Sequence, residues 1–321
     1  MKFLFVMDPI ERIDVTKDTT FVFLEEAQSR GHQNYHCGIR DLTVADGKVH
    51  ATCSPLQVKP VQGSHWAFGT SAFVQAETFD AVFMRKDPPF DIDFFFSTHL
   101  LSLIDATKTF VFNNPRGLRE ATEKLFIMHF PDLIPETLVS SDATQILAFA
   151  DKVGGDIVVK PLDGCGGMGI FRITQGDLNT NSILETVTAE GKRQIMAQRF
   201  LPESRQGDQR LIYLDGKALG SMVRVPRADD LRGNIHVGGT CIAGQVGPRE
   251  LEICARLAPA LDALGIYFAG LDVIGDRLTE VNVTSPTGVQ EINTLSHAKL
   301  ESAVIDFVET KCQALGAAGP A

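Results

Sequence analysis

Three polar side chains interrupt an apolar stretch near the C-terminal end of the chain and restrict what it can fold into. Residues 270–286 read GLDVIGDRLTEVNVTSP, and Gly275-Asp276 separates two runs rich in Leu, Val and Ile. This pattern predicts a hairpin. Asp272, Glu280 and Asn282 stand among residues typical of a core, where an isolated carboxylate is costly to bury unless a positive charge meets it.

The register of this hairpin decides whether the three side chains can meet. Glu280 and Asn282 share one face because side chains alternate along a strand. Asp272 joins them only if the connection is the three-residue loop 275–277 or the ladder contains a bulge; otherwise it points to the other face. Such an oxygen-only set suits Mg²⁺, or Mn²⁺ in its place. A strand face with solvated acids is the alternative, and the spacing alone leaves both open.

A glycine-rich run follows the strand-like sequence DIVVKP at residues 156–161. Its sequence GCGGMG, residues 164–169, matches GxGxxG, but an alternating, strand-like segment follows where a dinucleotide site would need a helix. The glycines are therefore predicted to connect two strands. Their backbone N–H groups can approach a polyphosphate, and Lys160 adds a charge beside them. A flexible surface hairpin is the alternative.

Positive charge gathers between residues 210 and 232 of a chain whose net charge is −10. Arg210 and Arg224 lie at the outer ends of a predicted hairpin, and Arg227 and Arg232 lie in the polar, glycine-rich segment 226–240, which is typical of a mobile lid. Guanidinium groups clamp carboxylates and phosphates, whereas surface ion pairs are the alternative role. With the glycine loop and the metal set, the arginines favour ATP activation of a carboxylate, followed by attack of an amine.

Composition narrows the partners and the compartment. The acidic net charge argues against nucleic acid and anionic membranes as partners. No run approaches the roughly 18 apolar residues of a membrane span, and six cysteines without a CxxC pair indicate a reducing, cytoplasmic setting. Strand and helix patterns alternate up to Asn113-Asn114-Pro115, which predicts an open α/β lobe; helices are then expected at 119–126, carrying Lys124, and at 296–315.

Over its whole length the sequence resembles the ATP-grasp ligases, and specifically the prokaryotic glutathione synthetase family. The segments that carry the resemblance are FVMDPIERIDVTKDTT, FMRKDPPFDIDF, NNPRGLREATEKLF, KPLDGCGGMGIFRI, AQRFLP, GDQRLIYLDG and GLDVIGDRLTEVNVTSPTG. The resemblance implies an α/β fold, α+β in its C-terminal part: a Rossmann-like pre-ATP-grasp lobe at 1–122, an ATP-grasp small lobe at 123–201 and a C-terminal lobe at 202–315. The last residues, GAAGPA, predict a disordered tail at 316–321.

The resemblance also implies a reaction, in which γ-glutamylcysteine and glycine are joined through an acyl phosphate with release of ADP and phosphate, by a homotetramer. Its implied metal ligands are Asp272, Glu280 and Asn282, and its implied catalytic arginines are Arg210, Arg224 and Arg232. The implied substrate contacts are Arg85, Arg224, Ser285, Pro286 and Thr287. The implied ATP contacts are Lys124, Lys160, Asp163, Gly164, Gly166, Gly167, Gly169, Gln198, Phe200, Leu201 and Asp208.

One position departs from the family pattern, because Thr240 follows the two glycines of the lid where relatives carry a basic residue. Two other functions remain open from the sequence. One is another ATP-grasp ligase, acting on amino acids or D-alanine. The other is a non-catalytic module that binds ATP without ligating anything.

Overall fold

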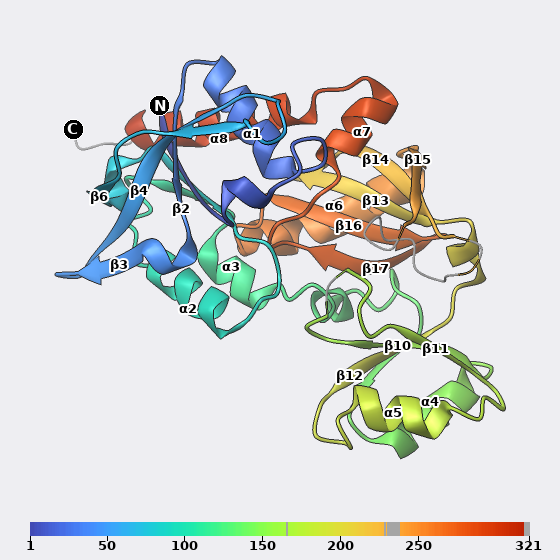
Figure 1. The fold of residues 1–321 in the computed structure, drawn as a ribbon. Helices are drawn as coiled ribbons and strands as arrows, with labels where there is room; N and C mark the ends of the chain where they lie inside the picture. Colours follow the sequence, from blue (N-terminus) through green and yellow to red (C-terminus); the bar gives the residue numbers. More distant parts are fainter. Residues whose placement is uncertain (165, 228, 230–237, 318–321) are drawn as a thin grey trace.

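Three β-sheets organise the chain, as the computed structural model in Figure 1 shows. The structure describes residues 1–164, 166–227, 229 and 238–317. One sheet belongs to the N-terminal part, a smaller one to the middle of the chain and one to the C-terminal part.

The N-terminal sheet has a parallel centre with an antiparallel extension. Its strand order is β3-β4-β2-β1-β7-β8, with β5 and β6 paired to β4. Parallel neighbours need long crossover connections, and α1 and α2 lie within them. Asp18 starts α1 by accepting a hydrogen bond from the backbone of Phe21. The elements are β1 (Lys2–Met7), α1 (Thr19–Ser29), β2 (Gln33–Cys37), β3 (Leu42–Ala45), β4 (Lys48–Val58), β5 (Trp66–Phe68), β6 (Ala72–Gln75), β7 (Ala81–Arg85), α2 (Ile92–Leu101) and β8 (Phe110–Phe112).

The middle of the chain forms a four-stranded antiparallel sheet with the order β11-β10-β12-β9. Helices α4 and α5 cover one face of it, and Ile146, Ile157 and Leu184 are among its buried core residues. The glycine-rich run connects β10 to β11, which confirms its prediction as a strand-to-strand loop. The elements are β9 (Thr137–Ser140), α4 (Ala143–Lys152), β10 (Asp156–Pro161), β11 (Phe171–Thr174), α5 (Thr180–Val187) and β12 (Ile195–Arg199).

The C-terminal sheet is antiparallel, with the order β15-β14-β13-β16-β17. Both predicted hairpins are present in it, β13 with β14 and β16 with β17. Together the three sheets confirm the predicted α/β class with a C-terminal α+β part. The elements are β13 (Asp208–Leu214), β14 (Lys217–Val225), β15 (Thr240–Ala243), α6 (Pro248–Ala263), β16 (Phe268–Ile274), β17 (Arg277–Asn282) and α7 (Val289–Ser296).

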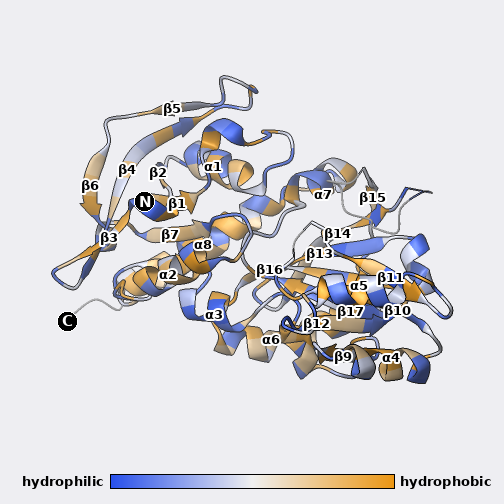
Figure 2. Cartoon of the chain, turned by 60° about the horizontal axis from the view of Figure 1, so that its bottom comes forward, coloured by the Kyte–Doolittle hydropathy of each residue, from blue (hydrophilic) through white to orange (hydrophobic). Residues whose placement is uncertain are grey.

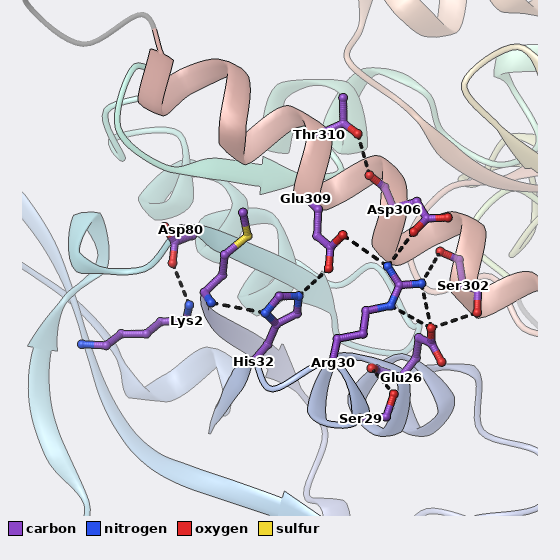
Figure 3. A network of polar contacts seen from close by, with 11 residues as sticks. Lys2, Glu26, Ser29, Arg30, His32, Asp80, Ser302, Asp306, Glu309 and Thr310 are labelled. Carbon is purple, nitrogen blue, oxygen red and sulfur yellow. Dashed lines mark hydrogen bonds and ion pairs between the residues drawn. The ribbon is translucent and has the colours of Figure 1, made fainter.

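The last helix, α8 (Leu300–Ala317), returns to the N-terminal lobe and packs beside α1. Figure 3 shows the polar contacts that join them: Arg30 binds Asp306 and Glu309, and the Nε2 atom of His32 lies 2.6 Å from the Oε1 atom of Glu309. The helix includes the first two residues of the expected tail, and residues 318–321 lie outside the described residues.

Two predicted helices differ in the structure. The helix expected at 119–126 is wrong, because α3 (Pro115–Glu120) ends after the first two residues of that span and Lys124 lies in the following turn. There the Glu123 carbonyl accepts a hydrogen bond from Val281 of β17, which a continuous helix would not allow. The helix expected at 296–315 begins only at Leu300, because His297 adopts a left-handed conformation that ends α7.

Figure 2 shows hydrophobic and hydrophilic residues mixed along the helices. In the part of the chain that the structure describes, no helix is both long and apolar enough to cross a membrane.

Candidate active site

The three sheets border one cleft of about 1300 Å³, a size that allows more than one small molecule to bind side by side. Its walls come from the loop after β1, from β12 and the glycine loop, and from the C-terminal sheet. Most of the residues that the sequence singled out line it, namely Lys124, Lys160, Gly164, Gly166, Gly167, Gln198, Phe200, Leu201, Asp208, Arg210, Arg224, Asp272, Glu280, Asn282, Ser285, Pro286 and Thr287.

The β16–β17 hairpin contains the irregularity on which the metal interpretation depended. Gly275-Asp276 forms a two-residue turn, and the register then shifts, so that Val273 pairs with Leu278 while Asp272 pairs with Glu280. Thr279 is the extra residue of this bulge. The expectation of a bulge is confirmed, and Asp272 and Glu280 lie directly opposite each other.

Asp272 is buried and forms ion pairs with two arginines from the neighbouring hairpin, Arg210 and Arg224. Arg210 also donates to the carbonyl of Thr287 at 3.1 Å. Burial alone would raise the pKa of Asp272, but the two guanidinium groups hold that pKa well below its usual range. The carboxylate therefore stays ionised and fixes both arginines at the cleft wall.

Arg224 has a second carboxylate partner, Asp208, which stands opposite it in the β13–β14 ladder. Burial raises the pKa of Asp208 to about 6, against the lowering influence of Arg224. The Oδ1 atom of Asp208 is buried and has no hydrogen-bond partner among the described residues. It is therefore an acceptor that a ligand hydroxyl group in the cleft can satisfy.

Two lysines meet at Glu280 on the other side of the hairpin. The Nζ atoms of Lys124 and Lys160 lie 3.6 and 3.5 Å from its Oε1 atom. Lys124 also donates to the carbonyl of Gly164 at 2.5 Å, which links it to the glycine loop. Burial lowers the pKa of Lys160, partly offset by Glu280. Two ammonium groups beside the glycine loop favour an anionic ligand there.

The predicted metal set consists of two carboxylates and one amide. No group of three or more His, Cys, Asp or Glu side chains suited to a metal ion occurs among the described residues. The Nδ2 atom of Asn282 donates to Gly270 and Asp272, which leaves its amide oxygen as an acceptor. Glu280 and Asn282 line the cleft with hard oxygen atoms, and Asp272 is shared with the arginines. This donor set fits a hard divalent cation.

Arg85, an expected substrate contact, is not among the residues that line the cleft. It is 3% exposed, and its guanidinium group packs over the ring of Phe268. There Nε donates to Thr20 at 3.0 Å and Nη2 donates to the Pro286 carbonyl at 3.1 Å. Arg85 is the last residue of β7, and its hydrogen bond to Pro286 supports a segment that lines the cleft.

Two glycine-loop positions with expected ATP contacts, Asp163 and Gly169, are not among the described residues that line the cleft. Asp163 forms an exposed ion pair with Arg193. Gly169 has a φ of +72°, and a Cβ atom there would meet Pro161 at 2.8 Å, so this glycine is required by the shape of the loop.

Most of the predicted lid, including Arg232, lies outside the described residues. Of the rest, Arg227 forms an exposed ion pair with Asp229, and Thr240 begins β15 opposite Val225.

The sequence analysis did not identify several charged residues that line the cleft. Four follow β1, one lies in the turn after α3 and one in α7, and they are Arg12, Asp14, Lys17, Asp18, Glu123 and Glu291. The sequence position of the first four could have indicated their place in the cleft. They lie in the loop after the first strand of a parallel sheet, and open α/β sheets bind ligands at such loops.

Comparisons with known proteins bear on the whole chain. The N-terminal domain model of prokaryotic glutathione synthetase matches residues 1–119, and the ATP-grasp domain model of the same family matches residues 123–297. The chain is 42% identical over 318 residues to the glutathione synthetase of Synechocystis sp., covering 96% of this chain and 99% of the relative. It is 43% identical over 318 residues to that of Synechococcus elongatus, covering 96% and 98%.

Solved structures show the same fold at low sequence identity. A D-cycloserine synthetase superposes with a TM-score of 0.65 at 15% identity, covering 96% of this chain and 100% of that chain. An ATP-grasp ligase complexed with its precursor peptide superposes with a TM-score of 0.63 at 15% identity, covering 97% and 98%. At this identity the likeness shows the architecture and nothing about the substrate.

Proposed function

Because this chain belongs to the prokaryotic glutathione synthetase family, whose members are ADP-forming ATP-grasp ligases, we propose that its cleft binds ATP, γ-glutamylcysteine and glycine side by side. The chain is thus an enzyme of ATP-dependent glutathione synthesis. The observation that carries the assignment of the cleft is the β16–β17 hairpin, where two lysines meet Glu280 and two arginines meet Asp272.

ATP occupies the end of the cleft between the small sheet and β17. Lys124 and Lys160 contact its phosphates, and the glycine loop covers them with backbone N–H groups. The adenine ring lies against the end of β12, beside Phe200 and Leu201. Gln198 lines the same end, Asp208 offers its unsatisfied oxygen to the ribose, and Gly164, Gly166 and Gly167 form the cover over the phosphates.

Glu280, Asn282 and Asp272 hold Mg²⁺, or Mn²⁺ in its place. The oxygen-only donor set supports this assignment. When bound, the ion neutralises part of the negative charge of the phosphates.

The arginines act on the two reaction steps. In the first, a carboxylate oxygen of γ-glutamylcysteine forms a bond to the γ-phosphorus of ATP, and the bond to ADP breaks. In the second, the glycine nitrogen forms a bond to the acyl carbon, phosphate leaves, and the nitrogen loses its proton. Arg210 and Arg224 stabilise the negative charge on the transferred phosphate and on the oxyanion of the second step. Arg232 of the lid is assigned the same task.

Ser285, Pro286 and Thr287 border the peptide part of the cleft. Arg85 supports them through the Pro286 carbonyl. The proposal further includes the division into lobes at 1–122, 123–201 and 202–315, a homotetramer and a cytoplasmic location. Family resemblance supports the division into lobes and the homotetramer. For the location, the five described cysteines are free thiols, as expected in a reducing compartment.

An assay of ADP release tests this function. We expect release that requires Mg²⁺, γ-glutamylcysteine and glycine together, with glutathione formed in equal amount. Release that continues unchanged without glycine would contradict ligation. Replacing glycine by D-alanine, or γ-glutamylcysteine by free amino acids, tests the other ATP-grasp ligases. Binding of ATP without any release of ADP would instead indicate the non-catalytic module.

A further inference from the structure

One part of the cleft has charged residues to which none of the roles above is assigned. It is formed where the loop after β1 meets the first turn of α7. Gln290 holds the two together, because its Nε2 atom donates to the carbonyls of Val15 at 3.0 Å and Asp18 at 2.6 Å. Asp18 and Glu291 both line the cleft at this junction, which we name the acidic corner.

Glu291 lacks the partner that a buried carboxylate requires. Its Oε2 atom is inaccessible to solvent and has no hydrogen-bond partner among the described residues, where no ion pair involves the side chain either. Burial raises the pKa of this carboxyl, and among the described residues Lys17 and Arg210 lower it only through charge. A buried carboxylate oxygen without a donor is costly, so this oxygen can accept a hydrogen bond from a ligand in the cleft.

Asp18 contributes a second acceptor to the acidic corner. Its carboxylate caps α1, because Oδ1 accepts from the backbone of Phe21 at 2.6 Å. Burial raises the pKa of Asp18 to about 6, although Arg85 lies near enough to oppose this rise. The capping carboxylate also lines the cleft, where its oxygen atoms can accept a further hydrogen bond from a ligand.

Positive side chains stand beside this corner. Lys17 lines the cleft next to Asp14, and Arg12 lines it without an ion pair to any described residue. Carboxylates and cations side by side complement a zwitterion, which needs donors and acceptors at once. The corner also adjoins the arginine pair, because Arg210 binds the carbonyl of Thr287, four residues before Glu291.

We propose that Asp18 and Glu291 bind the α-ammonium group of the γ-glutamyl end of the dipeptide, with Arg12 and Lys17 facing its α-carboxylate. This inference rests on the function proposed above. In this orientation the other end of the dipeptide, with the carboxylate to be phosphorylated, points toward Arg210 and Arg224. The acidic corner then selects donors with a free α-amino group.

A double-mutant cycle between enzyme and substrate tests the proposal. The donors are γ-glutamylcysteine and its deamino analogue, N-(4-carboxybutanoyl)cysteine, and the enzymes are wild type and Glu291→Gln. We expect kcat/KM to fall about tenfold or more when either partner is changed, the effect of losing one charge-assisted hydrogen bond. Changing both should cost little more than changing one, because the same contact is removed. The KM values for ATP and glycine should not change.

Control variants distinguish loss of the proposed contact from a general effect of removing a charge and from misfolding. Glu11→Gln removes the same charge from an exposed position on the same loop, outside the cleft lining, and should leave kcat/KM for both donors unchanged. Asp18→Asn keeps a residue able to cap α1 and repeats the cycle if Glu291→Gln does not fold. Losses that multiply, or a rise in KM for glycine instead of the dipeptide, would overturn the acidic corner alone. A wild type that makes no glutathione would overturn the proposed function and this inference with it.

Discussion

Asp272 and Glu280 lie opposite each other across β16 and β17, yet each binds a different pair of cations. Asp272 binds two arginines of the neighbouring hairpin, whereas Glu280 lies between two lysines that reach it from outside the sheet. A regular ladder with a two-residue turn would place the two carboxylates on opposite faces. The bulge at Thr279 therefore brings both pairs of cations to the cleft.

Glu280→Gln should reduce turnover strongly without unfolding the protein. The change removes the carboxylate shared by Lys124 and Lys160 and a proposed metal ligand, so we expect kcat to fall by at least about 10²-fold. Binding of ADP should also lose its dependence on Mg²⁺, as measured by calorimetry. Glu185→Gln, on the exposed side of α5, is the matched control. Near-normal turnover with retained circular dichroism would remove the metal assignment.

Asp18 should make the free energy of unfolding depend on pH. Burial raises its pKa from 3.8 to about 6, so the folded state binds the proton more tightly than the unfolded state. This stabilisation is absent above pH 7, grows as the pH falls through 6 and is complete below the unfolded pKa.

The test compares wild type with Asp18→Asn by urea unfolding at several pH values. Between pH 7.5 and 5 the stability of wild type relative to the variant should rise by about 1.4 kcal/mol. A relative stability that stays constant or falls over this interval would show that Asp18 keeps its ordinary pKa in the folded protein.

Arg85→Lys should lower the free energy of unfolding and leave ATP binding nearly unchanged. Lysine retains the charge but not the planar group that donates to both Thr20 and Pro286, and its ammonium group would be buried. We expect a loss of about 1 to 3 kcal/mol in the free energy of unfolding, the cost of unsatisfied buried groups.

Measurements of KM distinguish this supporting role of Arg85 from direct contact with the substrate. The KM for ATP should be unchanged, and the KM for the dipeptide should rise modestly because the Pro286 segment borders the peptide part of the cleft. An unchanged unfolding midpoint together with a large rise in the dipeptide KM would instead indicate that Arg85 contacts the substrate.

Gly117→Ala should destabilise the contact between α3 and the end of α6. A Cβ atom at Gly117 would lie 2.2 Å from the carbonyl oxygen of Leu264 and 2.9 Å from the side chain of Ile266. Overpacking of this kind costs about 1 to 3 kcal/mol, more when the obstacle is backbone. Gly316→Ala in α8, where nothing lies within 4 Å, should be neutral or stabilising by up to about 1 kcal/mol. Equal thermal midpoints for the two variants would contradict the packing.

Local sequence patterns were sufficient to predict the elements that depend mainly on neighbouring residues in the chain. The strand before the glycine loop and both C-terminal hairpins follow from alternation and turn residues. The helix expected around Lys124 failed because the backbone of Glu123 pairs with β17, a partner about 160 residues away that no local pattern contains.

The sequence by itself determined the fold class, the family and most of the residues that meet in the cleft. Turn residues, alternation along strands and the family motifs can all be recognised in the sequence without knowing its tertiary contacts. Only the tertiary structure decided which way the side chains face. Among the described residues, Asp18 and Glu291 line the cleft, whereas Arg85 and Asp163 do not. The reason is physical: the burial and pairing of a charge depend on segments that are distant in sequence and become neighbours only when the lobes pack together.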